Sequence, residues 1–320
     1  MSEYGNFIRR ADLIKNLVDR KNLAEQTKKP NRTIQEANRQ RWLQYQEIQR
    51  MSLTAKIAAA NASGGTSVDV DAQAFITAAA ITDATQQSAI DTLVTGLKTD
   101  GIWTKMKAIY PFVGGTATTH KFNLKDPRDL DAAFRLTFSG GWTHSSTGAL
   151  PNGTNAYADT KLNANTNLTF ANTHFSIYSR TNTTVNANSI GVFNNVLSIY
   201  ALAILGTTGL QYDGYDYTAH RLVLSNANSL GHYIGNVSST TSQKIFKNGS
   251  VLGSVTAAQT QTSLPNLNFY LSTRNDNNVA SAFDSKQLAF STIGDGLTDT
   301  QASNLYTRVQ AFQTTLSRQV

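Results

Sequence analysis

The sequence predicts a mainly β protein: an antiparallel jelly-roll sandwich, preceded by an α-helical N-terminal arm and flanked by short helices. From about residue 121, apolar residues recur at every second position in short segments, and Asn, Gly, Thr and Ser divide these segments. Many short strands with turn residues between them are typical of a sandwich or jelly roll, not of a parallel sheet. The first 60 residues instead have few Gly and many Gln, Arg, Lys, Ala and Leu, which favours helices.

The arm, residues 1–60, also differs from the rest of the chain in charge. Its 12 Lys and Arg against 6 Asp and Glu give the arm a net charge of +6. Because the whole chain has a net charge of +7, the rest of the chain is nearly neutral. Apolar residues at three-to-four spacing form two stripes, separated by Pro30. Because short isolated helices are marginal in water, these stripes need a partner surface. We expect the arm to be anchored in a larger assembly through Ile8, Ile14, Leu17, Ile34, Trp42, Tyr45 and Ile48.

The arm is followed by a predicted linker and a predicted helical connector. Residues 61–72 are small and polar and contain two consecutive glycines, as flexible linkers do. In the connector, residues 73–120, a helix is predicted to begin at Thr82 or Asp83, and one of its faces carries Ile90, Leu93, Val94 and Leu97. Ile102–Tyr110 is predicted to form a second short helix, which ends at Pro111.

Residues 121–320 are predicted to form the jelly-roll domain. Its clearest hairpin is at Lys247–Ser250, because Asn-Gly fits the positive-φ turn that joins two antiparallel strands. A closing helix is predicted where Thr298 and Gln301 have the spacing of a capping box. The helix has an apolar stripe that we expect to pack on the sandwich, made of Ala302, Leu305, Tyr306, Val309, Phe312 and Leu316.

The order of these pieces resembles the concanavalin A-like jelly roll of the laminin-G and pentraxin type. The hairpin at Asn248-Gly249 and the closing segment Leu297–Tyr306 (LTDTQASNLY) carry this resemblance, which covers residues 134–320 and implies the lectin/glucanase fold. Residues 81–160 also resemble sequences that are common in tailed-bacteriophage structural and fibre-type proteins. This second resemblance rests on overall likeness and on no functional motif.

The sequence disfavours an enzyme. Retaining glycoside hydrolysis, which the lectin/glucanase fold can host, needs two carboxyl groups about 5 to 5.5 Å apart, usually glutamates. No Glu occurs after Glu47, and no Asp-x-Asp lies on a predicted sandwich strand. The chain has no Cys, no G-x-S-x-G elbow and no phosphate-binding glycine motif. We therefore expect no catalytic residues. The longest apolar run, Val196–Leu205, is about half of what spans a bilayer, and no secretory signal is expected.

No cofactor is expected, and calcium is the one metal that the residues leave open. Asn275–Asn278 and the pair Asp213 and Asp216 supply oxygens, but calcium takes six to eight of them. Turn formation by Asn and Asp explains both clusters without an ion. The five histidines are scattered, with no pair at ligand spacing, so zinc is not predicted.

A glycan-binding site is the one functional site that the sequence suggests. Sugars are bound by aromatic faces together with Asn, Asp and Arg side chains. The densest such group consists of Tyr212, Asp213, Tyr215, Asp216, Tyr217 and Arg221, and Trp142 with His144 forms a second one. The alternative is that the tyrosines are strand residues that pack on one face, with Asp213-Gly214 in a turn.

Taken with the phage resemblance, these observations suggest a non-enzymatic virion structural protein, assembled in the host cytoplasm. Its arm would bind other virion proteins and form a homo-oligomer, by analogy with fibres a trimer, while the jelly roll contacts host glycans or proteins. One alternative is a capsid or tail decoration protein without glycan binding, and a second is a polysaccharide-degrading enzyme. A membrane partner is not expected. Nucleic-acid binding is disfavoured because clustered Lys/Arg faces with interleaved aromatics are missing.

Overall fold

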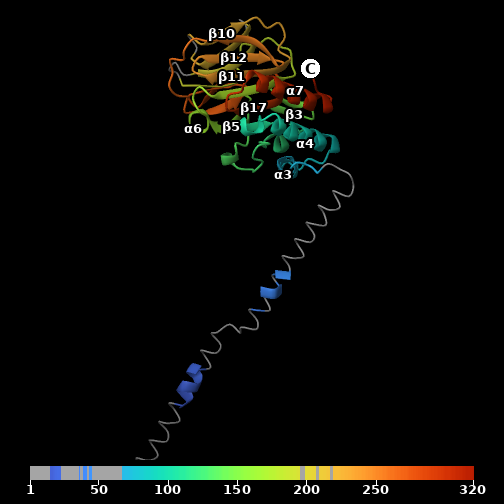
Figure 1. Ribbon diagram of the computed structural model, residues 1–320, viewed down its shortest axis with the longest axis vertical. Coiled ribbons are helices and arrows are strands. Elements are labelled where there is room, and N and C mark those ends of the chain that lie inside the picture. Colours follow the sequence, from blue (N-terminus) through green and yellow to red (C-terminus); the bar gives the residue numbers. More distant parts are fainter. Residues whose placement is uncertain are drawn as a thin grey trace, which may run out of the picture. The chain divides into compact units, whose positions relative to one another are not determined.

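The computed structural model describes residues 15–22, 36, 39–41, 43–44, 67–194, 199–206, 209–216 and 219–320 (Figure 1). The chain divides into two compact units, Met1–Ser67 and Val68–Val320. In the first unit, the described residues up to 44 are helical and exposed, and Leu17 is 61% exposed. The other predicted anchoring residues lie outside the described residues: Ile8, Ile14, Ile34, Trp42, Tyr45 and Ile48.

The second unit is built on two β-sheets. In the first sheet, the strands follow the order β13-β12-β11-β6-β17-β4-β3, and β1 also pairs with β17. The bounds are β1 Met106–Tyr110, β3 Trp142–Ser145, β4 Gly148–Pro151, β6 Thr173–Ser179, β11 Gly231–Ser239, β12 Ser242–Lys247, β13 Ser250–Val255 and β17 Leu288–Gly294.

The second sheet follows the order β10-β9-β8-β7-β14-β5-β2, with β15 and β16 attached at β7. Its bounds are β2 Thr137–Ser139, β5 Tyr157–Asn163, β7 Ile190–Phe193, β8 Ile199–Gly206, β9 Gly209–Tyr215, β10 Arg221–Leu224, β14 Asn268–Leu271, β15 Arg274–Asp276 and β16 Val279–Ser281. Among the described strands every pairing is antiparallel except β15 with β7. This confirms the predicted antiparallel β-sandwich.

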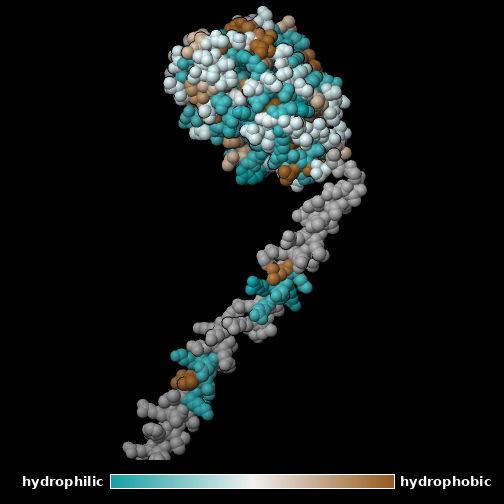
Figure 2. Space-filling model, viewed as in Figure 1, coloured by the Kyte–Doolittle hydropathy of each residue, from teal (hydrophilic) through white to brown (hydrophobic). Residues whose placement is uncertain are grey.

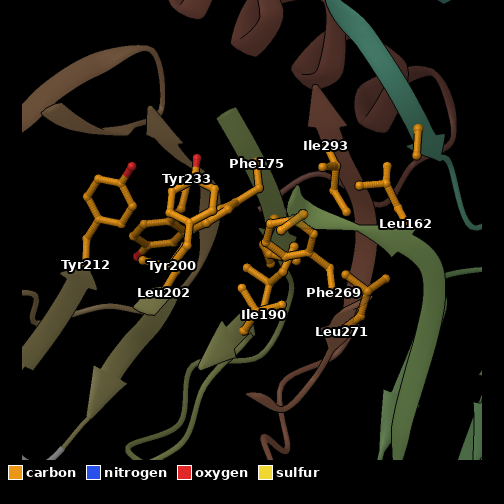
Figure 3. Close-up of a cluster of buried hydrophobic side chains, with 14 of the residues drawn as sticks. Leu162, Phe175, Ile190, Tyr200, Leu202, Tyr212, Tyr233, Phe269, Leu271 and Ile293 are labelled. Atoms are coloured by element: carbon orange, nitrogen blue, oxygen red, sulfur yellow. The ribbon is translucent and has the colours of Figure 1, made fainter. Parts of the chain in front are cut away.

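A core of aromatic and branched side chains fills the space between the two sheets. Phe175 of the first sheet packs against Tyr200 and Phe269 of the second, with ring centroids 4.4 and 6.2 Å apart (Figure 3). Inward-pointing residues alternate with residues that face away, as at Tyr200, Leu202 and Ile204 of β8 and at Phe175 and Ile177 of β6. Both sheets are thereby held together by apolar burial.

Helices cover the outer face of the first sheet, on one side of the sandwich in Figure 1. These are α3 (Val70–Ala78), α4 (Ala84–Thr99) and α7 (Asp299–Thr315). The predicted apolar face of α4 is buried, as is that of α7 at Leu305, Val309 and Phe312, and both join a second core with Phe290 of β17. The shorter helical segments are η1 Trp103–Lys105, α5 Ala117–His120, η2 Asp131–Ala133 and α6 Ala164–Asn167.

Local signals predicted the turn and helix starts correctly. Asn248 and Gly249 take φ of 50° and 78° and join β12 to β13. Asp83 accepts a hydrogen bond from the backbone N–H of Gln86 and caps α4. Thr298 and Gln301 form the predicted capping box at the start of α7.

Two predictions for the connector are wrong. Ile102–Tyr110 is not a helix: after η1 it forms β1, in which Ala108 pairs with Ile293 of β17. Because that partner lies far away in the sequence, long-range pairing overrides the local helical pattern. Residue 120 is consequently not a domain boundary, since the connector adds a strand to the first sheet. The predicted linker to residue 72 ends earlier, because Asp69 caps α3.

The visible surface of the second unit is largely hydrophilic or intermediate in hydropathy (Figure 2), with apolar side chains in small separate patches. Large contiguous apolar patches usually mark interaction sites or aggregation hazards. A functional site on this unit is therefore expected in a polar hollow rather than on an apolar surface.

Candidate functional site

The described tyrosines of the predicted glycan-binding group, Tyr212 and Tyr215, are buried. On β9, Leu210 and Tyr212 point inward, and Tyr212 and Tyr215 are both 0% exposed. The Tyr215 hydroxyl lies 2.6 Å from Thr173 Oγ1, and burial raises the pKa of both phenols. The expectation that these rings contact a glycan is therefore corrected: they belong to the core, as the alternative interpretation held. Tyr217 lies outside the described residues.

Asp216 is also buried, in a separate environment. Its Oδ2 lies 2.5 Å from Nδ1 of His220, which donates to it, and its Oδ1 accepts the backbone N–H of His220. With 1% exposure, the carboxylate has no surface to offer a ligand. Its role in the fold is to hold the start of the chain segment that leads into β10.

Asp213 and Arg221 do come together, on the outer face of the second sheet. They are cross-strand partners on β9 and β10, and the Arg221 Nε and Nη2 donate to the two carboxylate oxygens of Asp213 at 2.7 and 2.8 Å. Burial raises the pKa of the Asp213 carboxyl, against the opposing effect of the Arg221 guanidinium. Such a bidentate pair is geometrically rigid, so it fixes one side of a binding surface.

A polar pocket of about 250 Å³ opens beside this pair, and we call it the arginine pocket. Alanines leave the space open, and charged or amide side chains surround it. The lining consists of Asn186, Ala187, Asn188, Ala203, Gln211, Asp213, Arg221, Arg274 and Ala282. Ala203 lies on β8 and Gln211 on β9. Residues 186–188 precede β7, Arg274 begins β15, and Ala282 directly follows β16.

Arg274 is the member with the most informative surroundings. Its Nη2 donates to Asp276 Oδ2 at 2.9 Å, and its guanidinium lies 4.8 Å from the ring centroid of Phe193. Its Nε is buried and has no hydrogen-bond partner. A buried unpaired donor costs about 1–3 kcal/mol, and such groups in native proteins call for an explanation.

A buried ion pair supports the walls of the pocket. Lys286 Nζ donates to Asp284 Oδ1 at 2.9 Å, and the hydroxyl of Ser189 donates to Asp284 Oδ2 at 2.5 Å. The backbone N–H of Asn188 donates to the carbonyl of Ala282, which joins the two walls. Paired and hydrogen-bonded in this way, the charges can remain buried, and they hold the pocket-forming segments in place.

Sequence reasoning found Asp213 and Arg221 and missed the rest of the pocket. Gln211 could have been found, because a residue two positions before Asp213 on a strand must share its face. Arg274 and the amides of Asn186 and Asn188 carry no local signal, since only the folded chain brings them beside β9.

Trp142 and His144 lie elsewhere, on the edge strand β3 of the first sheet. The Trp142 indole N–H donates to the carbonyl of Ser139, and its ring packs 5.3 Å from that of Phe138. Nδ1 of His144 lies 2.9 Å from Nδ1 of His120, a pair that the sequence did not suggest. Burial, with a smaller effect of His144, lowers the pKa of His120 to about 3. Trp142 is not in the lining of the arginine pocket.

The oxygens that were considered for calcium are engaged within the protein. Asn277 and Asn278, with φ of 49° and 69°, form the turn between β15 and β16. The side chain of Asn275 donates to the carbonyl of Asn268 and accepts the backbone N–H of Asn278. In the described part of the chain, no three His, Asp or Glu side chains gather as metal ligands.

Comparison with known proteins identifies similar folds only. No family model and no curated protein matches the chain. Domain 4 of AbnA, a GH43 extracellular arabinanase from Geobacillus stearothermophilus, solved with arabinotriose, is 16% identical with a TM-score of 0.43, and the match covers 63% of this chain and 98% of that one. A mutant Trypanosoma rangeli sialidase that displays trans-sialidase activity is 8% identical with a TM-score of 0.45, and the match covers 72% of this chain and 39% of that one.

A third similar structure is the CBM40 of the Ruminococcus gnavus IT-sialidase bound to alpha2,3 sialyllactose. It is 12% identical, with a TM-score of 0.31, and the match covers 44% of this chain and 92% of that one. At these identities and TM-scores, none of the three assigns a ligand or an activity to this chain. Within the described residues, no helix combines the length and the apolar character needed to span a membrane.

Proposed function

We propose that residues 68–320 form a glycan-binding module that holds its ligand in the arginine pocket. The observation that carries this proposal is the pocket itself: a hollow on the outer face of the second sheet whose lining includes two guanidiniums, a carboxylate and three amide side chains. Helices cover the outer face of the first sheet. A small number of well-placed polar groups in a preformed hollow is what orients a small ligand.

The lining suits a ligand that is rich in oxygen atoms. Amides of Asn186, Asn188 and Gln211 both donate and accept hydrogen bonds, and guanidiniums donate in a fixed fork. Together they match the alternating donor and acceptor character of sugar hydroxyls. The Asp213–Arg221 pair is already formed, so little side-chain ordering is needed when the ligand binds.

We propose that the module binds glycans without cleaving them. Glycoside hydrolysis of the common kind needs two carboxyl groups on either side of the bond. Among the described lining residues of the pocket only Asp213 has a carboxylate, and both of its oxygens accept from Arg221. Incubation of the protein with any glycan that it retains is expected to release no reducing sugar.

Filling the pocket is expected to abolish glycan binding. Ala203 lines the pocket from β8, so Ala203→Gln places a longer side chain in the space that the ligand would use. On a glycan array, this variant is expected to lose the signal of the wild-type protein. The matched control is Val223→Gln, on the same face of the sheet but outside the lining, where the side chain is 51% exposed. Equal binding by both variants would place the ligand elsewhere.

We further propose that the chain is a virion structural protein, located in the particle, whose arm attaches the module to other virion proteins. The support is the likeness of residues 81–160 to phage structural proteins and the distinct charge of residues 1–60. In this proposal, many copies bind weakly and avidity comes from their number.

The intact chain is expected to sediment as a homo-oligomer, by analogy with fibres a trimer, because the apolar stripes of the arm need a partner surface. Deleting residues 1–60 is expected to give a monomer in which the affinity of each single binding site is unchanged and the avidity is lost. A monomeric intact chain at micromolar concentration would count against oligomerisation through the arm.

A further inference from the structure

We infer that the ligand of the arginine pocket carries a carboxylate and that Arg274 is the residue that recognises it. This inference rests on the proposed function and names the chemical class of the glycan: an acidic saccharide such as one that contains a uronic acid. It follows from the inventory of hydrogen-bond donors and acceptors in the pocket and from the surroundings of one guanidinium.

The carboxylate oxygens in and beside the pocket are occupied. Among the described lining residues only Asp213 has a carboxylate, and both of its oxygens accept hydrogen bonds from Arg221. Just outside the lining, Asp276 accepts from Arg274 and, at 3.5 Å, from the hydroxyl of Ser281. A neutral sugar brings a donor with every hydroxyl and would depend on the amide oxygens of Asn186, Asn188 and Gln211, whereas a carboxylate accepts only.

Arg274 supplies the matching donor. Its Nε is buried without a hydrogen-bond partner, although the neighbouring Nη2 is satisfied by Asp276. Contact with the face of Phe193 and the bond to Asp276 hold the guanidinium in one orientation before any ligand arrives. The Arg274 side chain keeps 23% of its surface exposed, so a ligand oxygen can reach the exposed part of this guanidinium, and a charged oxygen would be held most strongly.

Arg274 lines the same pocket as the Asp213–Arg221 ion pair. Arg221 and Arg274 both line the hollow, and the positive charges of both lower the pKa of Asp213, although burial outweighs them. Each guanidinium already has one carboxylate partner within the protein, Asp213 or Asp276, so a ligand carboxylate would be held by directed hydrogen bonds from the other N–H groups rather than by an excess of positive charge. The small side chains of Ala187, Ala203 and Ala282 leave the necessary room.

The test uses the intact chain on an array printed in pairs, in which each uronate-containing oligosaccharide stands beside its carboxyl-reduced counterpart. We expect the protein to bind the acidic oligosaccharides and to bind their reduced partners about tenfold to hundredfold more weakly. This ratio of affinities corresponds to the loss of one hydrogen bond to a charged group. Arg274→Gln is expected to remove this preference. Arg274→Lys keeps the charge but lacks the planar guanidinium with its several N–H donors, and a similar loss is expected. The control is Arg135→Gln, at an arginine that pairs with Asp129 and Asp131 outside this pocket.

Each outcome decides the matter. Equal binding to acidic and reduced partners would overturn the inference and leave the proposed glycan binding intact. Wild-type affinity and preference in Arg274→Lys would show that the guanidinium is not used to recognise the ligand, and would also overturn it. Absence of binding to every glycan would overturn the proposed function itself. Thermal unfolding of each variant separates these results from a folding defect, and Arg274→Lys remains informative if Arg274→Gln does not fold.

Discussion

Lowering the pH from 7 to about 4.5 is expected to unfold residues 68–320, because three histidines are buried in their neutral form. Burial lowers the pKa of His120 and of His232 to about 3, and that of His174 to about 4. His232 lies among Tyr178, Phe290 and Tyr306, and neither of its nitrogens has a hydrogen-bond partner. An imidazolium in that position would be a buried, unpaired charge.

The direction of the effect follows from proton linkage. Above pH 6.5, which is the pKa of histidine in an unfolded chain, both states are neutral and the stability is fully present. As the pH falls toward 4, the unfolded state binds protons that the folded state does not, and stability is lost. Each histidine contributes about 1.4 kcal/mol per pH unit, so the three together approach about 4 kcal/mol per unit. Over two units, this loss is comparable to the whole stability of an ordinary domain.

Urea unfolding at half-unit intervals from pH 7 to pH 5 measures this slope. His232→Phe is expected to reduce it from about three protons to about two, and it breaks no hydrogen bond because the imidazole makes none. A free energy of unfolding that stays constant down to pH 5 would contradict the prediction. An unchanged slope in His232→Phe would remove His232 from the explanation.

Arg318→Met is expected to lower the free energy of unfolding by about 3–5 kcal/mol. The guanidinium is 1% exposed and donates to the carbonyls of Phe112, Pro111 and Ala289 at 2.8, 2.6 and 2.9 Å. Burial, with a smaller effect of Arg180, lowers its pKa to about 9. Methionine fills part of the volume but donates nothing, so the carbonyls of Pro111 and Phe112 would stay buried without a partner.

The matched control is Arg308→Met, the same substitution on α7. Arg308 is 36% exposed at its side chain and pairs with Asp100 at 2.7 Å. Exposed ion pairs contribute little, so the change is expected to stay within about 1 kcal/mol. Chemical unfolding at pH 7 compares the two variants. Equal losses of unfolding free energy in the two variants would show that burial does not increase the contribution of Arg318 to stability.

How much the sequence predicts depends on how local each determinant is. The turn at Asn248-Gly249 and the capping box at Thr298 are properties of four residues, and both are correct. The β1 strand is not local, because its conformation is set by pairing with β17, and it was mistaken for a helix. The fold class survives such an error because it follows from the alternation of apolar residues over many segments.

The candidate site is less accessible to sequence reasoning than the fold. Tyr212 and Asp213 are adjacent in sequence, but strand geometry sends one into the core and the other to the opposite face of the sheet, where it lines the arginine pocket. Period-two reasoning shows that the two point to opposite faces, yet it does not say which face is buried. Arg274 joins the site only because the β15–β16 hairpin folds back beside β7.

The β15–β16 hairpin is a part of the module whose sequence can change without disturbing the sandwich. The floor of the pocket at Ala203 and Gln211 is built into central strands, whereas one wall is a short excursion whose tip is the Asn277-Asn278 turn. Changes at the base of the hairpin, at Arg274 and Ala282, would leave the sandwich intact and reshape the hollow that a ligand meets. Libraries that randomise residues 274 and 282 are therefore a route to new binding preferences on the same scaffold.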